Sequence, residues 1–212
     1  MLVAVLGIAL SSSVGFGAIL DVDGNITPAD YDFSYTDSDI AGEPFAGTGL
    51  DIDTVHFGAV PSPLAPEWFT LGMTVANSSI NTTGDGTMGP FSRTSIVVNL
   101  SQGQTTFMIQ ATLLAGTVQD VLMLDTSGPA PAFVPLSEPT DLRYAVGTGF
   151  EIAIKTSKFT NFSPASPFDF AILFEGGGTD RDDIISGKVP EPATMTFLAL
   201  GGLAVLRKRR KK

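Results

Sequence analysis

Apolar and polar residues alternate along much of the chain between residues 20 and 188, and helical periodicity is almost absent. From Phe69 to Val75 every odd-numbered residue is apolar, and the residues between them are Thr, Gly and Thr. An alternation with a period of two predicts a strand with one buried face. The same pattern predicts strands at 94–100, 107–113, 150–155 and 168–174, with further strands at 19–23, 31–36, 52–58, 117–124 and 142–147.

Glycine- and proline-containing turns separate these segments, for example at residues 83–86 and 175–178. Nine or ten short strands of this kind predict an all-β fold, an antiparallel β-sandwich of jelly-roll or immunoglobulin-like topology. A closed barrel is the alternative. The proline-rich segments 59–66 and 126–141 are predicted to be loops, and the second is expected to cross from one sheet to the other.

The two ends of the chain differ from the body between them. Residues 1–18 combine an apolar stretch, Leu2 to Leu10, with small residues after it, which indicates a signal peptide. No basic residue precedes that stretch, so a buried element of the body is the alternative. Residues 19–188 form the predicted β-sandwich domain.

Residues 189–212 hold a motif, an apolar span and a basic tail. The span from Ala193 to Leu206 predicts a short membrane-spanning helix. The positive charge beyond it predicts a cytoplasmic C-terminal side. That charge is carried by Arg207, Lys208, Arg209, Arg210, Lys211 and Lys212.

The order of these three parts resembles the PEP-CTERM sorting signal of Gram-negative bacteria, with Pro190, Glu191 and Pro192 as the motif. The resemblance implies export, passage through the inner membrane, and processing by an exosortase. It also implies delivery to the cell surface or to an extracellular polysaccharide matrix. A permanent C-terminal anchor without processing is the alternative.

Charge and composition narrow the function of the body. Residues 21–188 hold six basic and 21 acidic residues, a net charge of −15, which excludes a nucleic-acid binder as the default. The chain has no cysteine and one histidine, His56, which we expect on a strand surface; thiolate sites and two-histidine metal sites are excluded. No nucleophile elbow or phosphate-binding glycine loop is present, so we expect no catalysis. The alternative is a secreted hydrolase that uses scattered carboxylates.

Three segments of the body resemble secreted sandwiches of the DOMON and family 9 carbohydrate-binding-module type: Val22 to Tyr31, Asp51 to Gly58, and Gly149 to Phe174. The resemblance implies binding of sugar or haem, and His56 alone does not supply paired haem ligands. A sugar site would use aromatic side chains, for which the candidates are Trp68, Tyr31, Tyr35 and Tyr144.

Acidic turns are candidates for a structural Ca²⁺, because that ion takes carboxylate and carbonyl oxygens. The candidate ligands are Asp21, Asp23, Asp180, Asp182 and Asp183. The segment that begins at Asp21 lacks the Gly and Glu of a full calcium loop. Solvated surface turns are the alternative, and no other cofactor is expected.

Overall fold

The computed structural model describes residues 21–37, 49, 51–60, 67–83, 93–176 and 183–190. These residues form eleven strands and two short 3₁₀ helices, η1 (Pro28–Asp30) and η3 (Thr156–Lys158). The strands are β1 (Phe33–Thr36), β2 (Ile52–Val60), β3 (Trp68–Val75), β4 (Thr94–Gln102), β5 (Thr105–Leu114), β6 (Thr117–Asp125), β7 (Ala132–Phe133), β8 (Leu142–Val146), β9 (Gly149–Lys155), β10 (Phe168–Glu175) and β11 (Asp183–Val189).

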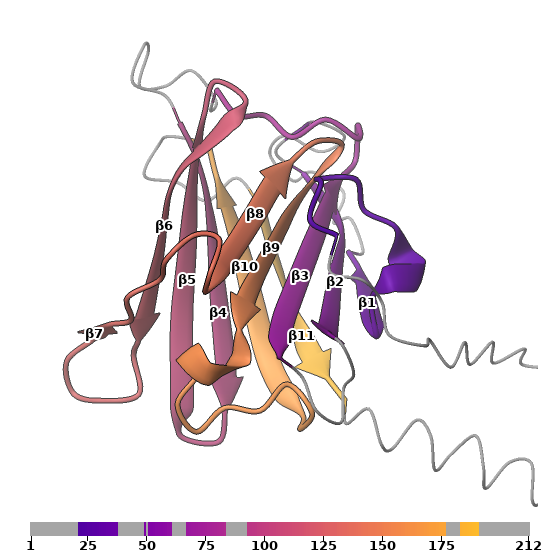
Figure 1. Cartoon of the computed structure of the whole chain (residues 1–212). Coiled ribbons are helices and arrows are strands. Elements are labelled where there is room, and N and C mark those ends of the chain that lie inside the picture. The colour runs from indigo at the N-terminus through magenta and orange to yellow at the C-terminus, as the bar shows by residue number, and fades with distance from the viewer. Residues whose placement is uncertain are drawn as a thin grey trace, which may run out of the picture.

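The strands form two antiparallel sheets. The first sheet has the order β1-β2-β3-β9-β8, and the second has the order β11-β10-β4-β5-β6-β7. The two sheets lie in separate layers, with β8 and β9 in front in the view of Figure 1. The chain changes sheet between β3 and β4, between β7 and β8, and between β9 and β10. An all-β antiparallel fold is therefore confirmed, in two layers as a sandwich requires.

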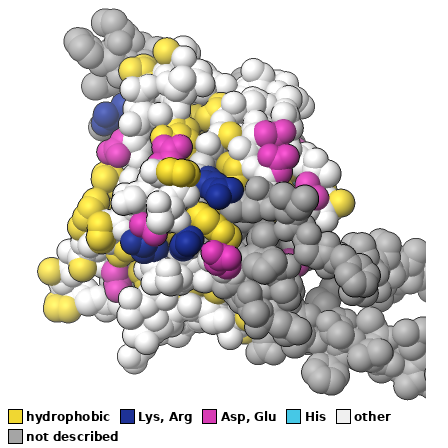
Figure 2. All heavy atoms as spheres, in the orientation of Figure 1, with side chains coloured by type: hydrophobic (Ala, Val, Ile, Leu, Met, Phe, Trp, Pro, Cys, Tyr) yellow, Lys and Arg dark blue, Asp and Glu magenta, His cyan; other side chains and the backbone are white. Residues whose placement is uncertain are grey.

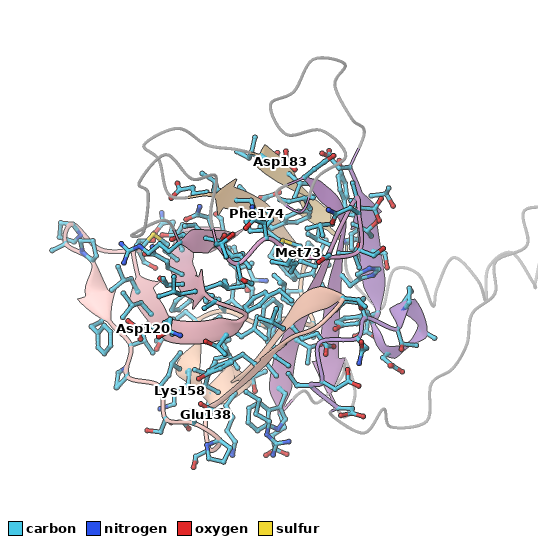
Figure 3. All side chains as sticks on the ribbon, turned by 90° about the horizontal axis from the view of Figure 1, so that it is seen from above. Met73, Asp120, Glu138, Lys158, Phe174 and Asp183 are labelled. Atoms are coloured by element: carbon cyan, nitrogen blue, oxygen red, sulfur yellow. The ribbon has the colours of Figure 1, made fainter. Side chains whose placement is uncertain are left out.

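The core between the layers is rich in phenylalanine. Phe57 and Phe69 of the first sheet contact Phe168 of the second at ring-centroid distances of 5.5 and 5.9 Å. Phe107, on β5, contacts Phe159 at 5.2 Å with the rings nearly perpendicular. Edge-to-face contacts of this kind are favourable, and a phenyl ring needs no polar partner when buried. Figure 3 shows Met73 and Phe174, which come from different sheets, near the centre of the molecule.

Most of the predicted strands are confirmed, with boundaries that differ by a few residues. The strand predicted at 19–23 is wrong for its described residues, because residues 21–23 belong to a segment without regular structure. The segment 126–141 does connect the second sheet to the first, but it includes the two-residue strand β7. The sequence patterns missed β11, whose apolar positions are interrupted by Ser186, Gly187 and Lys188. The predicted signal peptide and the predicted helix at 193–206 lie outside the described residues.

The ring cluster gives a stability prediction. Phe69 is 2% exposed and contacts the rings of Phe57, Phe159, Phe162 and Phe168. We expect Phe69→Ala to lower the free energy of unfolding by about 3–5 kcal/mol, measured by urea denaturation. Phe133→Ala is the matched control, because Phe133 is 61% exposed; its cost should stay below about 0.5 kcal/mol. Equal losses for the two variants would contradict this assignment of the core.

Candidate functional site

The outer face of the first sheet is covered by the segment 21–32, which we call the strap. Two glycines leave room for it: a Cβ at Gly72 would lie 2.5 Å from Tyr31 Oη, and a Cβ at Gly149 would lie 2.6 Å from Ile26 Cγ1. Any larger residue at these positions would displace the strap. The strap explains why almost every residue of β3 and β9 is buried, although alternation predicts only one buried face.

Glu151, on the outer face of β9, holds the strap in place. Its carboxylate is buried and accepts three hydrogen bonds from the strap. Oε2 accepts the backbone N–H groups of Asp23 at 3.0 Å and Gly24 at 2.8 Å, and Oε1 accepts the Tyr31 hydroxyl at 2.5 Å. A buried carboxylate is costly unless it is hydrogen-bonded in this way. Gly24 has φ +81°, a conformation that glycine adopts without strain.

His56 lies beside Tyr31 on the same face. It is 3% exposed, its Nδ1 is 2.7 Å from the Ser34 hydroxyl, and its ring centroid is 5.3 Å from that of Tyr31. Burial lowers the pKa of His56 and is opposed by the charge of Asp53. The prediction that His56 lies on a strand surface is therefore wrong: its side chain is on the outer face of β2, but the strap covers and buries it.

A second cluster surrounds Trp68 at the start of β3. The indole is 7% exposed and packs on Ala153, with Val22 of the strap against it. Two cations lie near the ring: Arg143 Cζ is 5.1 Å and Lys155 Nζ 5.5 Å from its centroid. Cations near an indole face are attracted by its quadrupole. Trp68 is therefore covered by charged groups.

The charges around Trp68 are only partly paired. Lys155 is 3.5 Å from Glu67, and Lys158 is 2.9 Å from Asp141. Arg143 is exposed and makes no ion pair with a described residue. We call Arg143 and Lys155, together with Trp68, the cationic patch. Figure 2 shows several Lys and Arg side chains on the face that carries β8 and β9, with Asp and Glu side chains between them.

The structure separates the four candidate aromatics. Tyr31 is engaged with Glu151, and a sugar could stack on Trp68 only if Arg143 or Lys155 moved aside. Tyr35 is 36% exposed and contacts Phe170 edge-on at 5.4 Å. Tyr144 is half-buried, and its hydrogen bond with Glu138 raises its pKa. Sugar stacking by these residues stays a prediction.

The candidate calcium ligands also lie apart where they are described. Asp23 accepts hydrogen bonds from the backbone and side chain of Asn25, which lower its pKa, and Asp21 is exposed at the start of the strap. Asp183 accepts the N–H of Ile52 at 2.6 Å and that of Ile184 at 2.6 Å. Asp180 and Asp182 lie outside the described residues. Within the described ranges, no three Asp, Glu or His side chains are placed to share a metal ion.

The sorting motif begins where the described chain ends. β11 continues through Val189, and Pro190 is the last described residue. Glu191, Pro192, the apolar span and the basic tail lie outside the described residues. The described part contains no helix long and apolar enough to cross a membrane.

Comparison with known proteins identifies this end of the chain. Residues 188–211 match the family model of the PEP-CTERM protein-sorting motif. The fold and this C-terminal match together define a class of protein: an exported protein with a two-sheet antiparallel body and a C-terminal sorting segment. The chain therefore carries a PEP-CTERM sorting signal, as Pro190, Glu191 and Pro192 predicted, and this signal implies sorting by an exosortase. No curated protein and no solved structure matches the chain.

The strap gives a prediction about Glu151. We expect Glu151→Gln to replace two charge-assisted hydrogen bonds to backbone N–H groups by weaker ones and to cost roughly 1–3 kcal/mol in local stability. Amide hydrogen exchange should accelerate in residues 21–32 and stay unchanged in β4 and β5. Glu67→Gln, at an exposed glutamate, is the control. Unchanged exchange in the strap would show that Glu151 does not anchor it.

Tyr31 gives a prediction about alkaline pH. Burial and the hydrogen bond to Glu151 raise the pKa of Tyr31 far above its ordinary value. The hydroxyl in the unfolded chain ionises near pH 10, whereas the folded one stays protonated, so its contribution to stability is complete below about pH 10 and falls above it. We expect the free energy of unfolding of Tyr31→Phe to fall less steeply above that pH than that of the unsubstituted protein. Tyr35→Phe is the control; identical slopes for all three proteins would refute this role.

Proposed function

We propose that this protein is a non-catalytic component of the cell surface or extracellular matrix, exported by way of the inner membrane and processed by an exosortase. In this proposal its β-sandwich body binds polysaccharide. The observation that carries the proposal is the PEP-CTERM signal joined directly to a folded two-sheet body. Because a sorting signal only delivers the body, the function in this proposal depends on the exposed faces of the body.

The hydrogen bonds made by three carboxylates support a binding protein over a hydrolase. Glu151 accepts hydrogen bonds from the strap, Asp183 from the backbone of Ile52, and Asp32 from the backbone N–H of Ala59 at 2.9 Å. Partial desolvation raises the pKa of Asp32, which is the kind of shift a general acid needs. Its Oδ2 nevertheless fixes the end of the strap to β2, a structural task.

The cationic patch is the surface best suited to a polysaccharide. An acidic body repels an anionic polymer over most of its surface. Arg143, which makes no ion pair with a described residue, reduces that repulsion locally, and its exposed guanidinium can donate two parallel hydrogen bonds to a carboxylate. The preferred ligand in this proposal is therefore a polysaccharide that carries carboxylate groups, bound beside the edge of Trp68.

The patch predicts salt-sensitive retention on an acidic polymer. We expect the exported protein to be retarded on immobilised polygalacturonate, with less retardation for Arg143→Ala and at high salt, because surface charge interactions are screened. Lys188→Ala removes the same charge from the outer face of the other sheet and is the matched control. Immobilised dextran controls for neutral sugar. Equal retardation of both variants, or of the unsubstituted protein on both polymers, would show that the cationic patch does not bind the acidic polymer.

Cell fractionation and mass measurement test processing. We expect the exported form to lack the basic tail that ends at Lys212. An intact Lys212 on the exported protein would instead establish the alternative, a permanently anchored envelope protein.

A further inference from the structure

The last strand of the body and the sorting motif overlap. β11 extends through Val189, whereas the family match begins at residue 188. Val189 is 5% exposed and pairs with Phe168 of β10. The motif therefore follows a buried core residue without a spacer.

β11 is held at both ends. At its start, Asp183 Oδ2 accepts the N–H of Ile52 in the opposite sheet. At its end, the Phe168 partner of Val189 packs its ring against Phe162 at 5.3 Å and against Phe57 of the first sheet. Detaching β11 would break seven residue pairings with β10 and expose Ile185 and Val189. The exposure of these two buried aliphatic side chains to water is unfavourable in addition to the loss of the backbone hydrogen bonds.

The surface beside this exit is also fixed. The two N–H groups of Gln102 Nε2 are shared among three carbonyl oxygens, those of Ser163, Ser166 and Pro167, at N···O distances of 3.0, 3.2 and 3.1 Å. Its Oε1 accepts the N–H of Ser163 at 2.8 Å. These bonds join the β4–β5 turn to the segment that leads into Phe168, so the exit of the chain lies at a hydrogen-bonded end of the body. Figure 1 shows the β4–β5 turn, the start of β10 and the end of β11 at the same, lower end.

The distance to the apolar span is short. Three residues, 190–192, separate Val189 from Ala193, and an extended chain covers at most about 3.6 Å per residue. When the apolar span is held in a membrane, this end of the body must lie roughly 10–15 Å from it. The region that surrounds the exit is then the surface that meets a membrane-bound processing enzyme.

We propose that the folded body sets the upstream limit of processing: the exosortase cuts on the C-terminal side of Pro190 or further along the motif, against the end formed by Gln102, Ser163–Pro167 and Val189, and the missing spacer limits its rate. The proposal rests on the processing proposed above. In the hydrolytic step, the peptide C–N bond that follows Pro190, or one further along the motif, breaks. Water supplies a hydroxyl to the carbonyl carbon and a proton to the amine that leaves with the apolar span.

The cut position is tested on the full chain, co-expressed with its exosortase. Tandem mass spectrometry of the exported form should find Val189 retained, with the C-terminus at Pro190 or later. A C-terminus at residues 183–189 would overturn the inference while leaving processing intact. An intact Lys212 would overturn both, which makes the two failures distinguishable.

The limit on the rate of processing is tested by inserting a flexible spacer where the chain leaves the body. A Gly/Ser spacer of about eight residues between Val189 and Pro190 adds roughly 15 Å of reach. In a pulse-chase experiment we expect the precursor of this variant to disappear several-fold faster, with the cut at the same position relative to the motif. The matched control carries the same spacer after Gly116, in the β5–β6 turn, where the glycine has φ +85° and open space around it. Equal rates for the two insertions would overturn the limit that we assign to the body.

Discussion

The structure depends on phenylalanine rings packed between two sheets in a chain that has no cysteine to cross-link them. Phe57, Phe69, Phe107 and Phe168 belong to strands of both sheets, and Phe159 and Phe162 fill the end of the layer from the segment between β9 and β10. Because these contacts are made by apolar rings alone, the core requires no buried polar partner. Polar side chains are therefore available to form hydrogen bonds on the outer faces of the sheets.

On the outer face of the first sheet, polar contacts hold the strap as a third, thin layer. The strap packs on glycine positions of β3 and β9, and Glu151 supplies the negative charge that its two N–H groups and the Tyr31 hydroxyl require. The segment from Val22 to Tyr31, which suggested a sugar- or haem-binding sandwich, acts here as a cover for the sheet. Its Asp23 and Gly24 donate backbone N–H groups to Glu151, and Tyr31 donates its hydroxyl.

The sequence was informative wherever one face of a strand is buried and the other is polar. Alternation located β4, β5 and β10, because buried apolar residues such as Ile96, Ile109 and Ile172 recur at every second position of each strand. It failed for the strap, whose residues are ordered by Glu151, more than 120 residues later in the chain. It failed also for β11, where Gly187 and Lys188 interrupt the pattern but the pairing with β10 imposes the strand.

The candidate site was less predictable than the fold. The sorting motif is read from order and position along the chain, so local sequence was sufficient to find it. The cationic patch depends on the antiparallel pairing that brings Arg143 of β8 and Lys155 of β9 to Trp68 of β3. These three residues are far apart in the sequence, so no local pattern predicts that they meet. Trp68 taken alone suggested stacking on a sugar instead.

The position of β11 in the strand order has a consequence for the timing of biogenesis. A chain is made from its N-terminus, and β11 is an outer strand of the second sheet although it is the last strand described. Its Asp183 accepts a hydrogen bond from Ile52 in the other sheet. This particular link between the layers can therefore form only after nearly all of the body has been synthesised. The sorting signal is the very next segment to be made. Completion of the fold and appearance of the sorting signal are therefore nearly simultaneous, and a chain truncated before residue 188 would also lose the end of its final strand, including the buried Val189.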